Sequence, residues 1–302
     1  MRSETALALS AAAVLLTAVL LAAGCEQFQQ TLDVAADLVE QHPGLIPGEE
    51  DRAKWTAGAR LAKSLVNEIS VREEIGIGQS LALRAFASFG QPYPDEDLQR
   101  YVARVGKLVA LQSERPSLPY SFAVVQSEKP NALALPGGFV FVSTGLLRRL
   151  RSESELACIL GHEICHVAQK HGIEIVERDR VISRMVDFGA VLKEDVGEYR
   201  QFIDLTYQKL TTEGYDRRYE WIADEAGVRY AFAAGYHPGG LLPFMEESRR
   251  SATPMAFEVF KTHPDPGVRI EKIHAVLGAL GPYSATPKLA ARYQREALAK
   301  LL

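Results

Sequence analysis

The chain has 302 residues, 47% of them hydrophobic and 24% charged, with a net charge of −4. This length and composition allow one substantial hydrophobic core. The slight negative charge gives no reason to expect nucleic acid as a partner. Three cysteines (Cys25, Cys158 and Cys165) are too few for a disulfide scaffold.

The first 24 residues have the features of an export signal. A run without charged side chains extends from Thr5 to Gly24, which is long enough to span a bilayer as a helix. It ends in LAAGC, which resembles the lipobox of bacterial lipoproteins. We expect residues 1–24 to be a signal peptide and Cys25 to be lipidated; the alternative is an uncleaved anchor. Both predict an exported chain tethered to a membrane. The absence of Asp after Cys25 resembles lipoproteins sorted to the outer membrane, facing the periplasm, if the source is Gram-negative.

Four segments are expected along the chain. Pro-Gly pairs in HPGLIPGEED make residues 25–54 a tether, which follows the signal peptide. A folded domain is expected over residues 55–280 and a C-terminal helix over residues 281–302. Within the domain, the pattern from 55 to 89 is helical, and so is DEDLQRYVARVGKLVALQS. The second helix has apolar residues at helical spacing: Leu98, Tyr101, Val102, Val105, Leu108 and Val109.

A small sheet is predicted in the middle of the domain. PYSFAVVQS has the pattern of a strand, and ALPGGFVFVSTGLL contains a turn followed by a second β-rich run. A helix is then expected from Ser152, which with Glu155 makes a capping box, to about His171, with Gly172 as the stop. Further helices are predicted over residues 173–212, over YEWIADEAGVRYAFAAG, and on both sides of THPDPG.

The sequence LGHEICHVAQKHG contains an H-E-x-x-H motif. On a helix, His162 and His166 lie about 40° apart around the axis, so both imidazoles face one way. This spacing suits two ligands of a tetrahedral zinc ion. Glu163 points about 100° away from His162, beside the metal, where a base can take a proton from water. The motif also arises by chance, so a third ligand is needed before the motif can be interpreted as a zinc site.

The third ligand is predicted outside the motif. His171 lies about 140° around a continuing helix from His166 and is expected to face away from the metal. Glu220 and Asp224 are also four residues apart on a predicted helix, and apolar residues such as Trp221 and Ile222 surround them. Carboxylates in apolar surroundings need partners, so Glu220 is expected to bind the metal. Asp224 is expected to accept the spare N–H of a ligand histidine. The alternative is a solvated acidic helix face.

A family resemblance follows from several segments together. The chain contains, in this order, EEIGIG, LQRYVARVGKLVA, NALALPGGFVFVSTGLL, SESELACILGHEICHVAQKHG, YEWIADEAG and THPDPGVRI. It resembles the HtpX-like and BepA-like gluzincin metallopeptidases of peptidase family M48 over roughly residues 55–275. The resemblance implies a zincin-like α+β fold, mostly helical, with a small sheet beside the metal helix. It also implies one Zn²⁺ held by His162, His166 and Glu220, with Glu163 as general base.

Other residues are weaker candidates. The strand NALALPGGFVFV fits an edge that binds extended substrate through Asn131 and Ala132, with Gly137 and Gly138 allowing close approach; an ordinary hairpin is the alternative. His263 is expected to stabilise the oxyanion, unless it is only a turn residue.

Arg269 and two cysteines are the remaining residues of interest. Arg269 is expected to support the site by pairing with one of the two carboxylates on the second helix. Cys158 and Cys165 are seven residues apart on one helix, about 10.5 Å along its axis, which is too far for a disulfide. We interpret both as packing residues; the alternative is a redox role or the binding of an inhibitory metal.

The sequence therefore predicts a membrane-tethered zinc endopeptidase. Its expected substrates are unfolded or extended proteins, in particular misfolded or unassembled proteins of the cell envelope. Its membrane partner is reached through the lipid anchor. The alternative is a zinc-stabilised chaperone or scaffold for envelope assembly, although a scaffold has no need of a base at Glu163. The sequence leaves the oligomeric state open.

Overall fold

The structure is a computed structural model that describes residues 69–177, 196–212, 214–250 and 266–301. The predicted signal peptide, Cys25, the predicted tether and His263 lie outside these residues. The described part is mostly helical with one small mixed sheet, so the predicted α+β class is confirmed. Within it, we find no helix with the length and hydropathy needed to cross a bilayer.

Helices α4 and α5 begin at well-formed caps. α4 (Val71–Ser88) starts at Ser70, whose hydroxyl and backbone exchange hydrogen bonds with Glu73 in a capping box. α5 (Glu96–Ala110) starts at Asp95, whose carboxylate accepts the N–H of Leu98 at 2.8 Å. The predicted apolar stripe of α5 is buried except at Leu108, which is 50% exposed. Leu108 lies about 80° from the centre of the stripe, so its side chain passes out of the core.

The sheet has three strands in the order β1-β3-β2. β1 (Ser121–Val125) runs parallel to the central strand β3 (Phe139–Ser143), and β2 (Ala132–Leu135) runs antiparallel to it. Within the described residues, β2 is hydrogen-bonded only to β3, which makes it an edge strand as predicted. Alternate side chains of β3 enter two different clusters: Val140 and Val142 face one side, and Phe141 faces the other.

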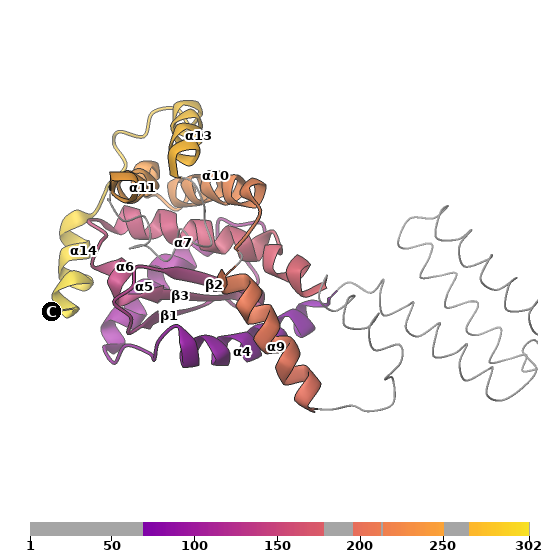
Figure 1. The fold of residues 1–302 in the computed structure, drawn as a ribbon. Helices are drawn as coiled ribbons and strands as arrows, with labels where there is room; N and C mark the ends of the chain where they lie inside the picture. The colour runs from indigo at the N-terminus through magenta and orange to yellow at the C-terminus, as the bar shows by residue number, and fades with distance from the viewer. Residues whose placement is uncertain (1–68, 178–195, 213, 251–265, 302) are drawn as a thin grey trace, which may run out of the picture. The chain divides into compact units, whose positions relative to one another are not determined.

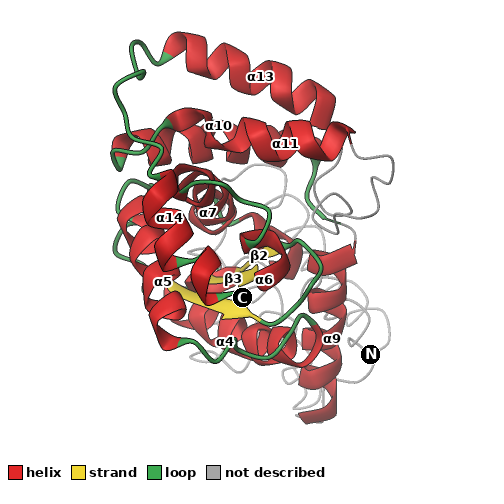
Figure 2. Ribbon diagram, turned by 90° about the vertical axis from the view of Figure 1, so that its left-hand side faces the viewer, coloured by secondary structure: helices red, strands yellow, loops and turns green. Residues whose placement is uncertain are grey.

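The helices form layers on both faces of the sheet (Figures 1 and 2). α4 and α9 (Val196–Thr212) cover the face that Phe141 enters. α7 (Glu153–Ala168) lies on the opposite face, with α5 beside it. α10 (Arg217–Ala233) packs on α7, and α13 (Pro266–Ala279) packs on α10. The short elements are η1 (Pro136–Gly138), α6 (Thr144–Leu147), η3 (Pro238–Gly240), α11 (Leu241–Arg250), α14 (Ala290–Glu296) and η5 (Leu298–Lys300).

Two glycines allow α7 and α10 to pack closely against each other. A Cβ built on Gly161 would lie 2.9 Å from the Cα of Gly227. A Cβ built on Gly227 would lie 2.8 Å from the backbone nitrogen of His162. Neither position has room for a side chain, so the two helix backbones touch. This close approach brings the first turn of α10 next to the histidines of α7.

The C-terminal segment is a shorter helix than predicted. The sequence suggested one basic helix to Leu302, but α14 covers only Ala290–Glu296 and η5 follows it. Tyr293 is fully buried and its hydroxyl donates to the carbonyl of Leu147 at 2.7 Å. Arg292 pairs with the buried carboxylate of Glu153 on α7. The segment therefore packs onto the same core as α7.

Candidate metal centre

α7 carries the H-E-x-x-H motif through the middle of the core. Its cap differs slightly from the prediction: Ser152 Oγ accepts the N–H of Glu155, but the Glu155 carboxylate accepts from Arg151 N–H. Every residue of α7 is buried, including the two motif histidines and Glu163. Polar groups in such a helix are costly unless they have partners, so the motif must be satisfied from neighbouring elements.

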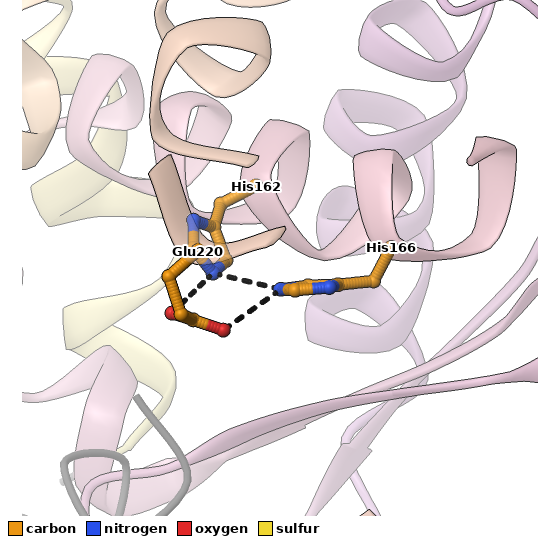
Figure 3. A group of neighbouring side chains, drawn as sticks. All are labelled: His162, His166 and Glu220. Atoms are coloured by element: carbon orange, nitrogen blue, oxygen red, sulfur yellow. Dashed lines mark hydrogen bonds and ion pairs between the residues drawn. The ribbon is translucent and has the colours of Figure 1, made fainter. Parts of the chain in front are cut away.

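Three side chains from two helices converge on one point (Figure 3). The Nε2 atoms of His162 and His166 are 3.1 Å apart. Glu220, in the first turn of α10, lies across both: Oε2 is 3.6 Å from His162 Nε2, and Oε1 is 3.4 Å from His166 Nε2. Tetrahedral zinc with bonds of about 2.0–2.1 Å places its ligand atoms roughly 3.3–3.4 Å apart. Two imidazoles and a carboxylate at these separations therefore fit a zinc ion.

Asp224 and Arg269 stand behind His162. Asp224 Oδ1 lies 3.0 Å from His162 Nδ1. Arg269 of α13 donates to Asp224 from Nε and from Nη2, both at 2.7 Å, and its Nη1 lies 3.5 Å from Glu220 Oε2. With Nδ1–H donating to Asp224, the Nε2 atom of His162 carries its lone pair toward the metal position. The predicted pairing of Arg269 with these carboxylates is present.

The surroundings of Asp224, His162 and Arg269 determine their protonation states. Burial would raise the pKa of Asp224, but Arg269 and His162 hold it below its ordinary value, so the carboxylate is ionised. Burial lowers the pKa of His162 despite the nearby Asp224, so the imidazole is neutral. Burial also acts to lower the pKa of Arg269, but three carboxylates, Asp224 first, raise it. A neutral imidazole is the form that binds a metal.

His171 is not part of the candidate ligand group, as expected, but it contacts the ring of His166 and does not face away from the motif. α7 ends at Ala168, and Lys170 takes a left-handed conformation with φ of 58°. Helical structure resumes over residues 171–177 in a new direction, which places His171 Nδ1 2.9 Å from His166 Nδ1. Burial and the neighbouring His166 lower the pKa of His171 to about 3. His171 is therefore neutral, and its Nδ1 can accept the Nδ1–H of His166.

Two tyrosines that sequence reasoning missed complete this side of the site. Tyr215 stacks on the ring of His166 at 4.0 Å between centroids, and Tyr219 stacks on His171 at 4.1 Å. The Tyr219 hydroxyl donates to the carboxylate of Glu174. Burial raises the pKa of Tyr215, and so do the carboxylates of Glu163 and Glu220. Their only sequence signal is position, since both tyrosines shortly precede Glu220.

The prediction that apolar residues surround Glu220 and Asp224 is partly wrong. Both carboxylates are buried, at 1% and 2% exposure. Trp221 and Ile222, however, are 36% and 37% exposed, and Lys272 lies over the Trp221 ring at 4.0 Å. The carboxylates are buried because their face of α10 packs against α7 and α13, while the neighbouring face reaches the surface.

The predicted substrate residues lie on and beside β2. Ala132 is buried in the strand, and Asn131 donates its N–H to Ser143 Oγ at 2.9 Å. A Cβ on Gly137 would lie 2.7 Å from the Cα of Ile75, and one on Gly138 would lie 3.2 Å from the Cα of Tyr120. The chain's own backbone thus occupies the space beside both glycines. These contacts and the positive φ angles of 75° and 94° explain glycine at both positions, and a role of either residue in binding substrate stays a prediction.

Both described cysteines are free and fully buried. The Cys158 thiol donates to the carbonyl of Pro238 at 3.5 Å. Burial raises the pKa of each thiol to about 12, which leaves both protonated at neutral pH. Their surroundings agree with the interpretation of Cys158 and Cys165 as packing residues. Neither sulfur belongs to the group that could hold a metal.

Comparison with known proteins agrees with this geometry. The mitochondrial metalloendopeptidase OMA1 of Schizosaccharomyces pombe is 31% identical over 175 residues, which cover 57% of this chain and 51% of the relative. The beta-barrel assembly-enhancing protease of Escherichia coli is 24% identical over 221 residues, covering 70% of this chain and 45% of the relative. Its counterpart in Yersinia pestis is 25% identical over 240 residues, with 75% and 47% covered.

These relatives are longer proteins, and the chain spans about half the length of each. The sequence profile of peptidase family M48 matches residues 96–277, which include both metal-centre helices. The match covers more than half of the chain. The chain therefore belongs to peptidase family M48.

Proposed function

We propose that this protein is a zinc-dependent endopeptidase that hydrolyses peptide bonds of unfolded or extended proteins. The observation that carries the proposal is the buried group of His162, His166 and Glu220, whose ligand atoms lie within 4.8 Å of one another. Two histidines and a glutamate are the donor set of several catalytic zinc sites, which keep a further position open for water or substrate. A structural zinc site more often has four protein ligands.

Each residue of the proposed site has a distinct role. Bound zinc supplies Lewis-acid chemistry, since it lowers the pKa of a water molecule and polarises the scissile carbonyl. Glu163, buried on the same helix as the two histidines, is the proposed general base that takes the proton of that water. The water oxygen bonds to the carbonyl carbon, and the same carboxyl group delivers the proton to the amine as the C–N bond breaks. Asp224 orients His162, and Arg269 compensates the charge of Asp224.

The substrate is proposed to bind at β2. An extended peptide can add to an exposed strand edge through main-chain hydrogen bonds, and β2 is an edge strand next to α7. Binding of this kind recognises the main chain of the peptide and not its side chains, which suits unfolded substrates of varied sequence. Contact with substrate is assigned to Asn131 and Ala132, and a role of Gly137 and Gly138 stays a prediction because the chain's own backbone lies beside both.

The proposed location is the cell envelope. Residues 5–24 are uncharged and end at Cys25, which supports a lipid anchor in the membrane. The Escherichia coli relative is named for enhancing β-barrel assembly. We therefore assign misfolded or unassembled envelope proteins as substrates of this tethered enzyme, and His263 as the candidate donor to the oxyanion.

The Glu163→Gln variant tests the chemistry. Zinc content and cleavage of fluorescein-labelled casein should be measured on the full chain. The variant should retain zinc and lose cleavage by about 10²–10⁴-fold, because a general base contributes that much. Glu225→Gln is a matched control, since Glu225 is exposed on α10 and, within the part of the chain that the structure describes, forms an ion pair only with Arg229.

Two outcomes would contradict the proposal in different ways. Undiminished cleavage by Glu163→Gln would remove Glu163 as the base. If neither the wild type nor Glu163→Gln cleaves casein, and cells that carry Glu163→Gln grow normally, the chaperone or scaffold function is favoured. Undiminished zinc in His166→Ala or Glu220→Ala would remove that residue from the ligand set.

A further inference from the structure

An ion pair outside the metal centre joins α4 to the loop after α5. Glu74, in the first turn of α4, is 1% exposed. Its Oε1 accepts Arg115 Nη1 at 3.0 Å, and its Oε2 accepts Arg115 Nη2 at 2.6 Å. Two parallel hydrogen bonds between charged groups fix the orientation of both side chains. The proposed chemistry does not use this pair.

The side chain of each partner makes one further hydrogen bond, and the two bonds reach different elements. Glu74 Oε1 accepts the N–H of Gly137 at 3.0 Å, in the turn η1 that follows β2 directly. Arg115 Nη1 donates to the carbonyl of Val167 at 3.2 Å. Val167 is the residue after His166, in the last turn of α7, where a positive charge also complements the helix dipole. The pair therefore connects the end of the edge strand to the end of the metal helix.

α4 and η1 pack in direct backbone contact, which fixes the position of η1 relative to α4. A Cβ on Gly78 would lie 2.0 Å from the carbonyl oxygen of Pro136, and one on Gly137 would lie 2.7 Å from the Cα of Ile75. The turn thus touches the backbone of α4. Glu74, the end of β2 and His166 also lie around one narrow gap, so the connection is close to both the strand and the metal centre.

We propose that Glu74 and Arg115 are positioning residues that hold the edge strand β2 at a fixed distance from His166. A peptide added to β2 is then presented to the metal centre in register. The inference rests on the proposed endopeptidase function and on β2 as the strand that receives the substrate. β2 has four residues and, among those that the structure describes, pairs only with β3, so its position depends on support from its end.

The test compares two conservative variants of the full chain. Glu74→Gln keeps an oxygen for the Gly137 N–H but removes the charge. Arg115→Lys keeps the charge but cannot bond both Glu74 oxygens and Val167 together. With fluorescein-labelled casein, KM should rise about tenfold in Glu74→Gln and less in Arg115→Lys, while kcat and zinc content stay within about twofold, because a misplaced strand weakens ground-state and transition-state binding alike.

Glu96→Gln is the matched control, because it breaks the exposed pair with Arg100 on α5 and should leave KM unchanged. Backbone hydrogen exchange gives a second readout that needs no activity. Exchange over residues 132–138 should be faster in both variants than in the wild type, and exchange over residues 158–166 should be the same. If Glu74→Gln fails to fold, Arg115→Lys carries both measurements.

The failure of this inference can be told from failure of the proposed function. Folded, zinc-loaded variants with unchanged KM and unchanged exchange over residues 132–138 would overturn the positioning role. Loss of zinc from the variants would also overturn it, since the pair would then support the metal helix and not the strand. A wild-type chain that binds zinc but cleaves no casein would defeat the proposed function, and the exchange experiment would still decide the positioning role.

Discussion

His162 and His166 lie one turn apart on α7, and their Nε2 atoms meet at the same point, yet their outer ring nitrogens meet different partners. His162 Nδ1 faces the carboxylate of Asp224, which two hydrogen bonds from Arg269 hold in place. His166 Nδ1 faces the neutral ring of His171. One histidine is supported by an ion pair, and the other by a hydrogen bond between two imidazoles.

The two supports also differ in how they are held. The Asp224 side uses charge, and its three members come from α7, α10 and α13. The His166 side uses stacked rings, with Tyr215 on His166 and Tyr219 on His171. A charged support gives a stronger hydrogen bond, but it is destabilising when one partner is lost. An aromatic support is a weaker interaction, and it tolerates the loss of a partner better. The comparison predicts unequal effects when each side is broken.

The largest effect is expected from Arg269→Met. This change leaves the buried carboxylates of Asp224 and Glu220 without their cation, which should lower the free energy of unfolding of the zinc-free protein by about 3–5 kcal/mol. Urea denaturation in the presence of a chelator measures it. Arg229→Met, which breaks an exposed pair with Glu225, is the control and should cost about 1 kcal/mol or less. Equal losses in the two variants would mean that Arg269 does not hold this charge.

An intermediate effect is expected from Asp224→Asn. The amide keeps the shape of the side chain but weakens the hydrogen bond from His162, so zinc affinity should fall about 10–100-fold. Competition with a chromophoric chelator measures the affinity. Asp204→Asn serves as the control, because Asp204 is half-exposed on α9. Retention of wild-type affinity in Asp224→Asn would show that the charge of Asp224 is not needed to orient His162.

The smallest effect is expected from His171→Phe. Phenylalanine preserves the stack on Tyr219 but has no nitrogen to accept the His166 Nδ1–H. Zinc affinity should fall by about tenfold, at the lower end of the range for a residue that supports a metal ligand. The same chelator competition applies, and His274→Phe, at an exposed position of α13, is the control. A loss as large as that of Asp224→Asn would remove the distinction between the two supports.

The same two sides differ in how far they could be predicted. Spacing of four residues placed His162 with His166 and Glu220 with Asp224, because helix periodicity is a local property. Burial of both carboxylates followed, although the exposed Trp221 and Ile222 show that a mostly apolar sequence does not mean a helix buried on all sides. The roles of these residues as ligands, base and support remain predictions until zinc and cleavage are measured.

The His171 side could not be predicted because it depends on one backbone conformation. The sequence places a helix stop at Gly172, whereas α7 ends at Ala168 and Lys170 takes the positive φ. A lysine gives no signal for that conformation, since such angles usually fall to glycine or asparagine. Some glycines, such as Gly137 against α4, allow close contact between segments that are distant in the sequence. Such contacts cannot be predicted from a single sequence either.

The contact of Gly161 with Gly227 also bears on which cation the site can accept. Ligand atoms 3.1–3.6 Å apart suit bonds of about 2.0–2.1 Å, whereas calcium needs about 2.3–2.6 Å and more ligands. A methyl group on either glycine would push α10 away from α7 and carry Glu220 with it. The spacing of the three candidate ligand atoms therefore depends on the close packing of the two helix backbones at Gly161 and Gly227 as well as on the ligand side chains themselves.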